Sequence, residues 1–452
     1  MAAAIMGLRI SPRLPSICAC PLFSAVKRAL LAVLAAGVVW PGARSLAAAP
    51  PNVVLIIADD QAWTDFGFMG HPAIRTPRLD RLASEGVVFT RGYVPSSLCR
   101  PSLASIITGL YAHQHGLTCN DPPDGLPAAE RLRQRREQIA KIDGLATLPR
   151  LLASKGYLSL QTGKWWEGDY RRGGFTHGMT HGDPARGGRH GDDGLKIGRQ
   201  GLQPIFDFLD RAGGRPFFLW YAPMMPHEPH NPPPELLEKY RAKTDSLQVA
   251  RYWAMCEWFD RTCGELLDYL DKKDLSRSTL VVFLADNGWI QNPDKGGYAP
   301  KSKQSPYEGG LRTPIIVRWP GHLTPRRDER TPVVSIDLAP TILAACGLKP
   351  TPEMQGVSLL DSDALARRKA IFGEVFTHSA VDIHRPAANL RYRWSSDGRW
   401  KLILPHAANV PGARPELYDL LADPQETQDR ADARPDEVAR RRRQIEAWWP
   451  VP

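Results

Sequence analysis

The sequence predicts an α/β protein with a large mixed, mainly parallel sheet sandwiched by helices, and a small C-terminal antiparallel sheet. Two observations support this fold class. Over residues 52–319, short apolar runs typical of strands buried on both faces alternate with segments of helical period. After residue 347, short strands follow one another without intervening helices. We therefore expect an α/β domain over residues 50–347 and an α+β subdomain with a terminal helix over 348–452.

The first strand of the expected sheet is the apolar run 52–58, which ends abruptly at Asp59-Asp60. A helix is expected at 76–84, where Thr76 precedes Pro77 as at many helix starts. The same periodicities predict, in chain order, strands at 87–93, 158–162, 217–222, 279–285 and 314–319, and helices at 102–110, 145–154, 200–211 and 247–270. Residues 170–194 are rich in Gly, Arg and His and predict a surface loop.

The C-terminal part predicts short strands at 371–376, 392–396 and 400–404. Ser396-Asp397-Gly398 is typical of a hairpin turn between the last two strands. From Gln425 onward the sequence is charged and of helical type. The run Arg440 to Arg443 is interpreted as a solvated helical face, since no aromatic interleaving or nucleic-acid motif accompanies it. No nucleic-acid partner is therefore expected.

Composition and charge describe an ordinary globular chain with an unusual start. The 452 residues are 43% hydrophobic and 23% charged, with a net charge of +10. Residues 1–49 contain five basic residues and no acidic residue. There Lys27-Arg28 precedes the apolar run Ala29–Trp40, and small residues follow at 45–49, which predicts a signal peptide over 1–49 and export to the periplasm or the medium. The apolar run is shorter than the roughly 20 residues of a membrane-spanning helix, so no stable membrane span is expected.

Acidic and amide side chains follow two of the strongest predicted strands. Asp59 and Asp60 come after strand 52–58, and Asp286 and Asn287 come after strand 279–285. In an open α/β sheet, ligands bind outside the carboxyl ends of the strands. Hard oxygen ligands of this kind suit calcium or magnesium rather than zinc. The alternative is that Asp59-Asp60 only caps a following turn, but the second strand end favours a metal.

A third element is Cys99, which is followed by Arg-Pro-Ser102 at the expected start of a helix. The start of a helix is the positive end of its dipole and favours an anion. The other four cysteines beyond the signal segment are scattered, and Cys256 and Cys263, seven residues apart on one helix, are expected in the core. An odd number of scattered cysteines predicts neither a disulfide framework nor a zinc site.

Taken together and in order, these motifs resemble the type I sulfatases of the alkaline-phosphatase superfamily. The resemblance covers residues 52–423 and includes Thr162-Gly163-Lys164-Trp165, Pro226-His227-Glu228-Pro229, Ala285-Asp286-Asn287-Gly288, Lys303 four residues before Tyr307–Pro314, and Glu416–Leu420 with Asp423-Pro424. It implies an alkaline-phosphatase-like fold and hydrolysis of sulfate esters. Sulfated carbohydrate, or another sulfated small molecule, is the implied substrate.

The resemblance also implies a mechanism. In this family the signature cysteine is oxidised to formylglycine by a formylglycine-generating enzyme, and a hydroxyl of the hydrated aldehyde, held on one calcium ion, attacks sulfur. Cys99 is then both the nucleophile precursor and a metal ligand, together with Asp59, Asp60, Asp286 and Asn287. Lys164 and Lys303 would bind the sulfate oxygens, and His227 would bind sulfate or protonate the leaving alcohol.

Two positions depart from the family pattern. Leu103 stands where the family has an arginine that helps to hold the diol and belongs to the segment that the modifying enzyme recognises. Arg100, about one helical turn away, is a candidate replacement. Trp166 stands where the family has a histidine, and His227, His177, His181 and His190 are the candidate substitutes.

Two other functions compete with the sulfatase prediction. A phosphatase, phosphodiesterase or phosphonate hydrolase of the same superfamily is one, but its two-zinc members need Asp-His where this chain has Asp286-Asn287. A catalytically silent protein that binds sulfated glycans is the other, and Leu103 and Trp166 are the residues that suggest it.

Overall fold

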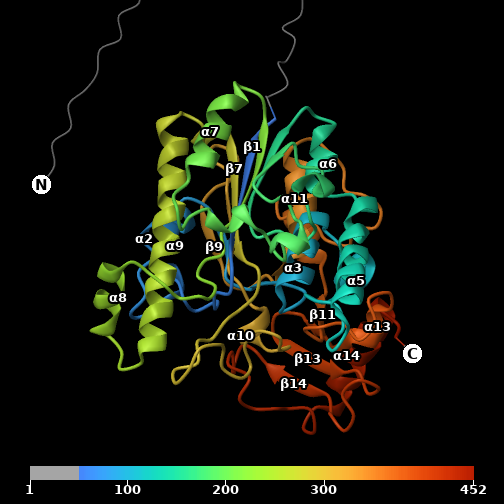
Figure 1. Cartoon of the computed structure of the whole chain (residues 1–452). Helices are drawn as coiled ribbons and strands as arrows, with labels where there is room; N and C mark the ends of the chain where they lie inside the picture. The colour runs from blue at the N-terminus through green and yellow to red at the C-terminus, as the bar shows by residue number, and fades with distance from the viewer. Residues whose placement is uncertain (1–49, 452) are drawn as a thin grey trace, which may run out of the picture. The chain divides into compact units, whose positions relative to one another are not determined.

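The computed structural model describes residues 50–451, so the predicted signal peptide at 1–49 lies outside the described residues. An eight-stranded sheet forms the centre, in the order β5-β4-β6-β1-β7-β8-β2-β9 (Figure 1). Its strands are β1 (Asn52–Ala58), β2 (Val87–Phe89), β4 (Leu158–Gly163), β5 (His177–Gly178), β6 (Phe217–Ala222), β7 (Thr279–Ala285), β8 (Ile315–Arg318) and β9 (Arg326–Asp328). The mixed, mainly parallel sheet confirms the predicted fold class.

The middle of the sheet brings the two predicted metal strands together. β1 pairs in parallel with β6 on one side and with β7 on the other. Ala58 is the register partner of Ala285, so β1 and β7 end at the same level. β8 runs antiparallel to both β7 and β2, which makes the sheet mixed.

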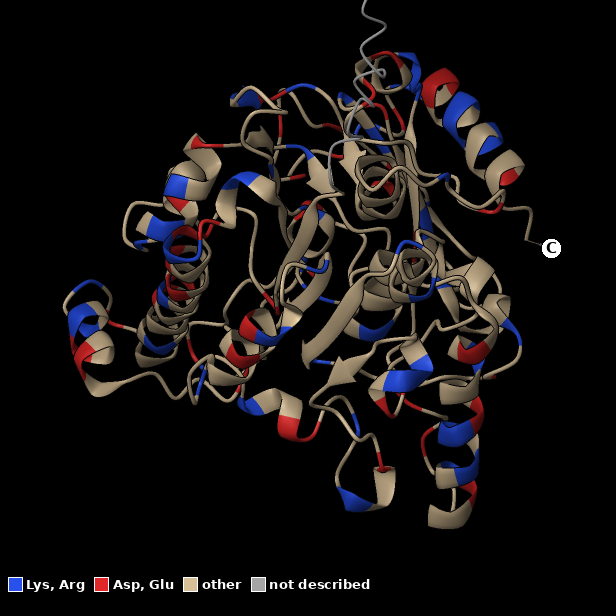
Figure 2. Ribbon diagram, turned by 90° about the horizontal axis from the view of Figure 1, so that it is seen from above, with Lys and Arg blue, Asp and Glu red and all other residues tan. Residues whose placement is uncertain are grey.

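Two helical layers cover the sheet because alternate residues of each central strand face opposite sides. Val54, Ile56 and Ala58 pack with α2 (Pro77–Ser84), α7 (Gln203–Ala212) and α9 (Leu247–Lys272). Val53, Leu55 and Ile57 pack on the other side with α3 (Cys99–Thr108), α6 (Leu148–Ala153) and α11 (Leu338–Ala345). Figure 1 shows these two groups of helices on either side of the strands. In Figure 2 the charged residues lie mainly on these outer helices and on loops.

The C-terminal part forms a separate antiparallel sheet, β11-β12-β13-β14. Its strands are β11 (Ile371–Phe376), β12 (Leu390–Ser396), β13 (Trp400–Pro405) and β14 (Glu416–Asp419), and α14 (Pro435–Trp448) packs against β12 and β13. Asp397, Gly398 and Arg399 form the hairpin turn, which is shifted by one residue from the predicted Ser396-Asp397-Gly398. The boundary between residues 347 and 348 stays a prediction.

Several predicted element bounds were wrong. The last helix begins at Pro435 rather than near 425, because Asp423 and Asp429 accept backbone N–H groups of the preceding segment and hold it in turns. The strand predicted at 87–93 is divided into β2 and β3 (Gly92–Tyr93), and β3 pairs with β10 (Val333–Val334). The helix predicted at 102–110 begins at Cys99, since a proline is tolerated in the first turn.

One helix, α5 (Ala128–Ala140), is largely polar and was not predicted from the sequence. The remaining α-helices are short: α4 (Ala112–His115), α8 (Pro234–Arg241), α10 (Glu308–Leu311), α12 (Ser362–Arg367) and α13 (Pro386–Asn389). Among residues 50–451, no helix combines the length and the apolar character that crossing a bilayer requires.

Candidate active site

The ends of β1 and β7 are tied directly to each other. The backbone N–H of Asp286 donates to the carbonyl of Ala58 (2.8 Å), and the N–H of Asp60 donates to Oδ1 of Asp286 (3.1 Å). Asp60 has a φ of +64°, in the left-handed region that aspartate tolerates better than most residues. This turn directs Asp59 and Asp60 toward Asp286 across the strand pair.

Three buried oxygen atoms at these strand ends have no hydrogen-bond partner within residues 50–451: Asp59 Oδ2, Asp286 Oδ2 and Asn287 Oδ1. The amide of Asn287 donates to Oδ1 of Asp60 (2.6 Å), which fixes its orientation. Asp59, Asp60 and Asp286 each offer a carboxylate oxygen within 4.8 Å of the others. Since buried polar atoms are nearly always satisfied, these oxygens fit a hard divalent cation.

Two buried lysines lie against the same carboxylates. Lys164 Nζ is 2.7 Å from Asp59 Oδ1, and Lys303 Nζ is 2.6 and 2.7 Å from the two oxygens of Asp60. Burial alone would lower the pKa of each lysine, but the neighbouring carboxylates outweigh burial and raise it. Both lysines are therefore cationic, and they would leave one negative charge uncompensated when all three carboxylates are ionised.

The two aspartates that share the backbone link respond in opposite directions. Burial acts against the ionised form of Asp60, but Lys303, His227 and Lys164 hold its pKa well below the usual range. Burial and the charge of Asp59 raise the pKa of Asp286 well above its usual value. A dication would remove this repulsion and leave the site net positive, which suits an anionic substrate.

Lys164 reaches the site because β4 ends in a glycine. Gly163 has a φ of +77°, and a Cβ at this position would lie 1.9 Å from the carbonyl oxygen of Ala222 on β6. Only glycine permits this approach. The backbone N–H of Lys164 then donates to the same carbonyl (2.7 Å).

Cys99 is the first residue of α3 and is buried at the same place. Its Sγ and one ligand atom each of Asp59 and His227 lie within 4.8 Å of one another. Burial raises the pKa of the Cys99 thiol to about 12, against the opposing effect of Lys164 and Lys303. The unmodified side chain is therefore a protonated thiol.

His227 is held beside the strand ends by its own segment. Pro226 forms a bridge with Asp59, and the N–H of Asp59 donates to the carbonyl of Met225 (2.9 Å). Nδ1 of His227 lies 2.6 Å from the carbonyl of Glu228, which assigns the proton to Nδ1 in the neutral ring. Nε2 faces Asp60 Oδ2 at 3.4 Å. Burial lowers the pKa of His227.

The structure thus brings together all the side chains that were singled out from the sequence: Asp59, Asp60, Cys99, Lys164, His227, Asp286, Asn287 and Lys303. The proposed replacement by Arg100 does not occur. Its guanidinium is buried, pairs with both oxygens of Glu167 and donates to Gln138. Leu103 lies in the apolar cluster beside the sheet.

Of the histidines considered as substitutes at position 166, His190 lies next to Trp166. Their ring centroids are 5.1 Å apart, and the carbonyl of His190 accepts from the N–H of Trp165 (2.9 Å). His177 packs against Phe208, and His181 pairs with Asp192. Three neighbouring residues, Asp121, Arg189 and His378, carried no recognisable signal in the sequence, because they are isolated polar residues in loops.

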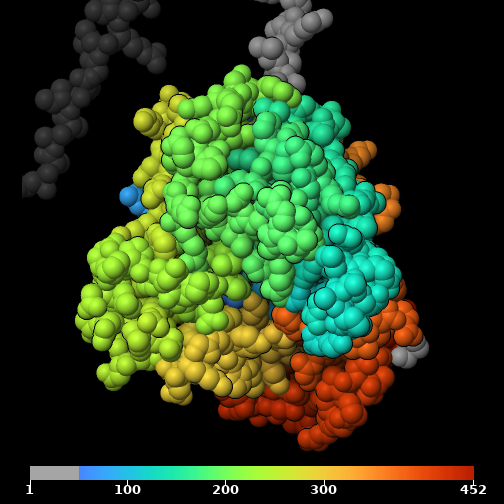
Figure 3. Space-filling view, viewed as in Figure 1, coloured from blue at the N-terminus to red at the C-terminus, as the bar shows by residue number. Residues whose placement is uncertain are grey.

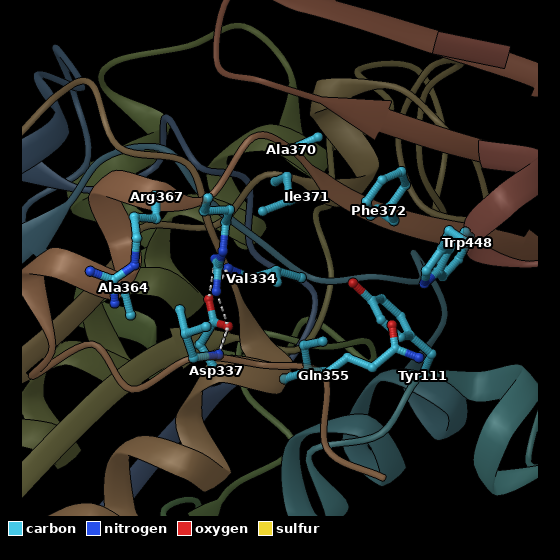
Figure 4. Close-up of a pocket in the computed structure, with 13 residues that line it drawn as sticks. Tyr111, Val334, Asp337, Gln355, Ala364, Arg367, Ala370, Ile371, Phe372 and Trp448 are labelled. Atoms are coloured by element: carbon cyan, nitrogen blue, oxygen red, sulfur yellow. Dashed lines mark hydrogen bonds and ion pairs between the residues drawn. The ribbon is translucent and has the colours of Figure 1, made fainter. Parts of the chain in front are cut away.

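A separate cavity of about 360 Å³ lies between α4, the segment around Asp337 and β11 (Figure 4). Its principal charged groups, Asp337 and Arg368, form a bidentate ion pair and satisfy each other. The cavity contains none of the predicted site residues.

Comparisons with known proteins show the family to which the chain belongs. The sulfatase family model matches residues 51–348, and the model of the C-terminal part of N-sulphoglucosamine sulphohydrolase matches residues 297–444. N-acetylgalactosamine-6-sulfatase of Canis lupus familiaris is 31% identical over 378 residues, covering 74% of this chain and 69% of that protein. Human arylsulfatase A is 31% identical over 376 residues, covering 71% of this chain and 68% of that protein.

The fold is also found in solved structures. The crystal structure of Ps i-CgsB superposes with a TM-score of 0.69 at 25% identity, covering 88% of this chain and 93% of that one. The match to the family model, the relatives that are sulfatases and the shared fold lead to one conclusion: this chain belongs to the sulfatase family and is a sulfate-ester hydrolase.

Proposed function

We propose that this sulfatase hydrolyses carbohydrate sulfate esters with one calcium ion and a formylglycine formed from Cys99. The observation that carries the proposal is the set of buried oxygens without partners, Asp59 Oδ2, Asp286 Oδ2 and Asn287 Oδ1, beside Cys99 Sγ. An N-acetylgalactosamine-6-sulfatase at 31% identity supports a carbohydrate as the substrate.

Asp59, Asp60, Asp286 and Asn287 would hold the ion, and the side chain at position 99 would reach it. When bound, calcium would lower the pKa of the attacking hydroxyl and neutralise charge on the sulfuryl oxygens. The hydrated aldehyde would supply the nucleophilic hydroxyl, which an unmodified thiol at this place does not.

The protein's own residues position and stabilise the ester. Lys164 and Lys303 are already fixed at the carboxylates on two sides of the site and would turn their remaining N–H donors to the sulfate oxygens. As the imidazolium, with Nδ1–H held by the carbonyl of Glu228, His227 would bind sulfate or give the leaving alcohol the proton of Nε2, which faces the site. The low-dielectric surroundings make these charges act strongly on the ester.

The amide at position 287 favours this function over phosphoryl transfer at two zinc ions. Asn287 offers one hard amide oxygen, while its nitrogen donates to Asp60, and it lacks the imidazole nitrogen that the two-zinc enzymes use at this position. The export signal and the formylglycine-generating enzyme as a partner belong to the same proposal.

Mass spectrometry of the peptide that contains Cys99 tests the proposal. Conversion of the thiol to the aldehyde lowers the mass by about 18 Da. We expect this loss in protein made with the modifying enzyme, together with calcium-dependent hydrolysis of aryl sulfates and little hydrolysis of aryl phosphates. A free thiol in every such preparation, or a clear preference for the phosphate, contradicts the proposal.

A further inference from the structure

Beside the site, two arginines share one carboxylate. Arg189 donates from Nε to Asp121 Oδ1 (3.1 Å) and contacts Oδ2 through Nη2, while Arg135 contacts Oδ1 through Nη2. Arg135 also donates to the carbonyl of Arg189 (3.1 Å). Within residues 50–451, Asp121 is the only carboxylate in an ion pair with either arginine, so one positive charge remains uncompensated.

Arg189 is held rigidly, with part of its guanidinium free. It lies over the Trp166 ring, 4.9 Å from the centroid, and Asp121 fixes it from the side. Its side chain is 44% exposed, against 14% for Asp121 and 8% for Arg135. Nη1 donates to no residue of the described chain. A guanidinium fixed in this way is prepared to bind an anion without much loss of side-chain entropy.

This cluster adjoins the catalytic centre. His190 is bonded through its carbonyl to Trp165, next to Lys164, and its buried Nδ1 has no partner in the described chain. Burial and the charges of Lys164, Arg189 and His227 lower the pKa of His190 to about 3, so its ring is neutral and within the field of the active-site lysine.

The C-terminal subdomain contributes His378 to the cluster, through a segment bonded to the backbone of Asn120 and Asp121. The N–H of Asn120 donates to the carbonyl of His378 (2.9 Å), and the N–H of Ala380 donates to that of Asp121 (2.9 Å). The His378 ring is 40% exposed and lies 3.9 Å from Asp121. Burial lowers the pKa of His378, and the charges of Arg189 and Lys303 add to this effect. In Figure 3 the cyan, green and orange surfaces that contain these three segments meet on one face.

We propose that Arg189, with His190 and His378, forms the subsite for the sugar that carries the ester, and that it selects carbohydrate sulfates with a second anionic group near that ester. The inference rests on the proposed function, because it needs the sulfate at Lys164 and Lys303. A carboxylate or a second sulfate would pair with the free edge of Arg189, and the two neutral imidazoles would bond to sugar hydroxyls.

The test compares three sugars that bear the same ester: N-acetylgalactosamine 6-sulfate, N-acetylgalactosamine 4,6-disulfate, and the 6-sulfate linked to glucuronate. We expect kcat/KM to be about tenfold to a hundredfold higher for at least one of the two dianionic substrates, as for one charged hydrogen-bonded pair. Arg189→Ala should remove this preference, and Arg189→Lys should retain part of it. The third sugar distinguishes a carboxylate from a sulfate as the selected group.

Arg171→Ala is the matched control. Arg171, in a short 3-10 helix (Tyr170–Gly173), also lies over an aromatic ring, Tyr170 at 4.5 Å, and pairs with Asp169. Its side chain is 70% exposed and pairs with none of the site residues. Its removal should leave the preference intact. Equal rates with all three sugars in the wild type, or a preference that survives Arg189→Ala, would overturn the inference.

Measurements of sugar binding distinguish a failure of this inference from a failure of the catalytic proposal. Calorimetry with a Cys99→Ala variant in calcium measures affinity for the same three sugars without turnover. If no sulfate ester is hydrolysed but the dianionic sugars bind more tightly and Arg189→Ala abolishes the difference, the subsite stands and the catalytic proposal fails. If aryl sulfate is hydrolysed but the three sugars bind equally, the subsite fails alone.

Discussion

The two sides of the active site are built in different ways. The metal side consists of consecutive residues at the ends of two adjacent parallel strands, Asp59-Asp60 and Asp286-Asn287. The neighbouring cluster, which we propose as the substrate side, is assembled from Asp121, Arg189 and His378, which come from three distant loops. The first is fixed by backbone pairing in the core, and the second by side-chain contacts at the surface. Such a division allows one chemistry to serve different substrates, because loops change without disturbing the sheet.

The largest effect is expected on the metal side, from Asp286→Asn. This change keeps the shape but removes one charge, and turnover of aryl sulfate should fall at least about a thousandfold. In the wild type, calcium at a hundred times its dissociation constant should stabilise the fold by about 2.7 kcal/mol, and the variant should lose this effect. Thermal unfolding with and without calcium measures it.

Without calcium, Asp286→Asn should be no less stable than the wild type, because burial and the charge of Asp59 disfavour the ionised Asp286. An undiminished calcium effect on the variant would show that the ion binds elsewhere.

A second effect concerns the attachment of the subdomain that carries His378. Lys401 on β13 is fully buried, with Nζ 3.0 Å from Glu308 and 2.9 Å from Glu426, and Glu308 also accepts from Tyr93 (2.9 Å). Lys401→Met would leave the buried Glu426 without a cation and Glu308 with Arg312 alone, at 3.7 Å. We expect it to lower the free energy of unfolding by about 3–5 kcal/mol, measured by denaturant titration.

The triple variant Lys401→Met, Glu308→Gln, Glu426→Gln is the control, since it removes the charges together. It should recover much of the loss. If Lys401→Met alone leaves the free energy of unfolding nearly unchanged, the cluster does not attach the subdomain as described.

The two sides also differ in what the sequence could predict. The meeting of Asp59-Asp60 with Asp286-Asn287 was predicted because apolar strands that end in such residues are local patterns, and parallel pairing brings their ends together. The left-handed turn at Asp60 was not predicted, because it depends on the bond from its N–H to Asp286. Nor was the pairing of Arg100 with Glu167, which needs α3 and the loop after β4 to meet in space. Arg189 and Asp121 are 68 residues apart and share no periodicity.

The smallest effect is a dependence of stability on pH at His115, which ends α4 and contacts α3, the helix that presents Cys99. His115 is buried, its Nδ1 accepts from the N–H of Leu117 (3.1 Å), and its Nε2 lies 3.2 Å from Ser105 Oγ on α3. Burial lowers the pKa of His115 to about 3, below its usual 6.5. Between these values the unfolded chain binds a proton that the folded protein does not, so stability falls as the pH falls from 6.5 toward 3.

His115→Gln should reduce the slope of unfolding free energy against pH by about 1.4 kcal/mol per pH unit near pH 5, measured by denaturant titration. His384→Gln, at an exposed position, is the matched control. An unchanged slope in His115→Gln would mean that α3 relaxes to accommodate the charged ring, and the metal side would then be less rigid than the strand pairing implies.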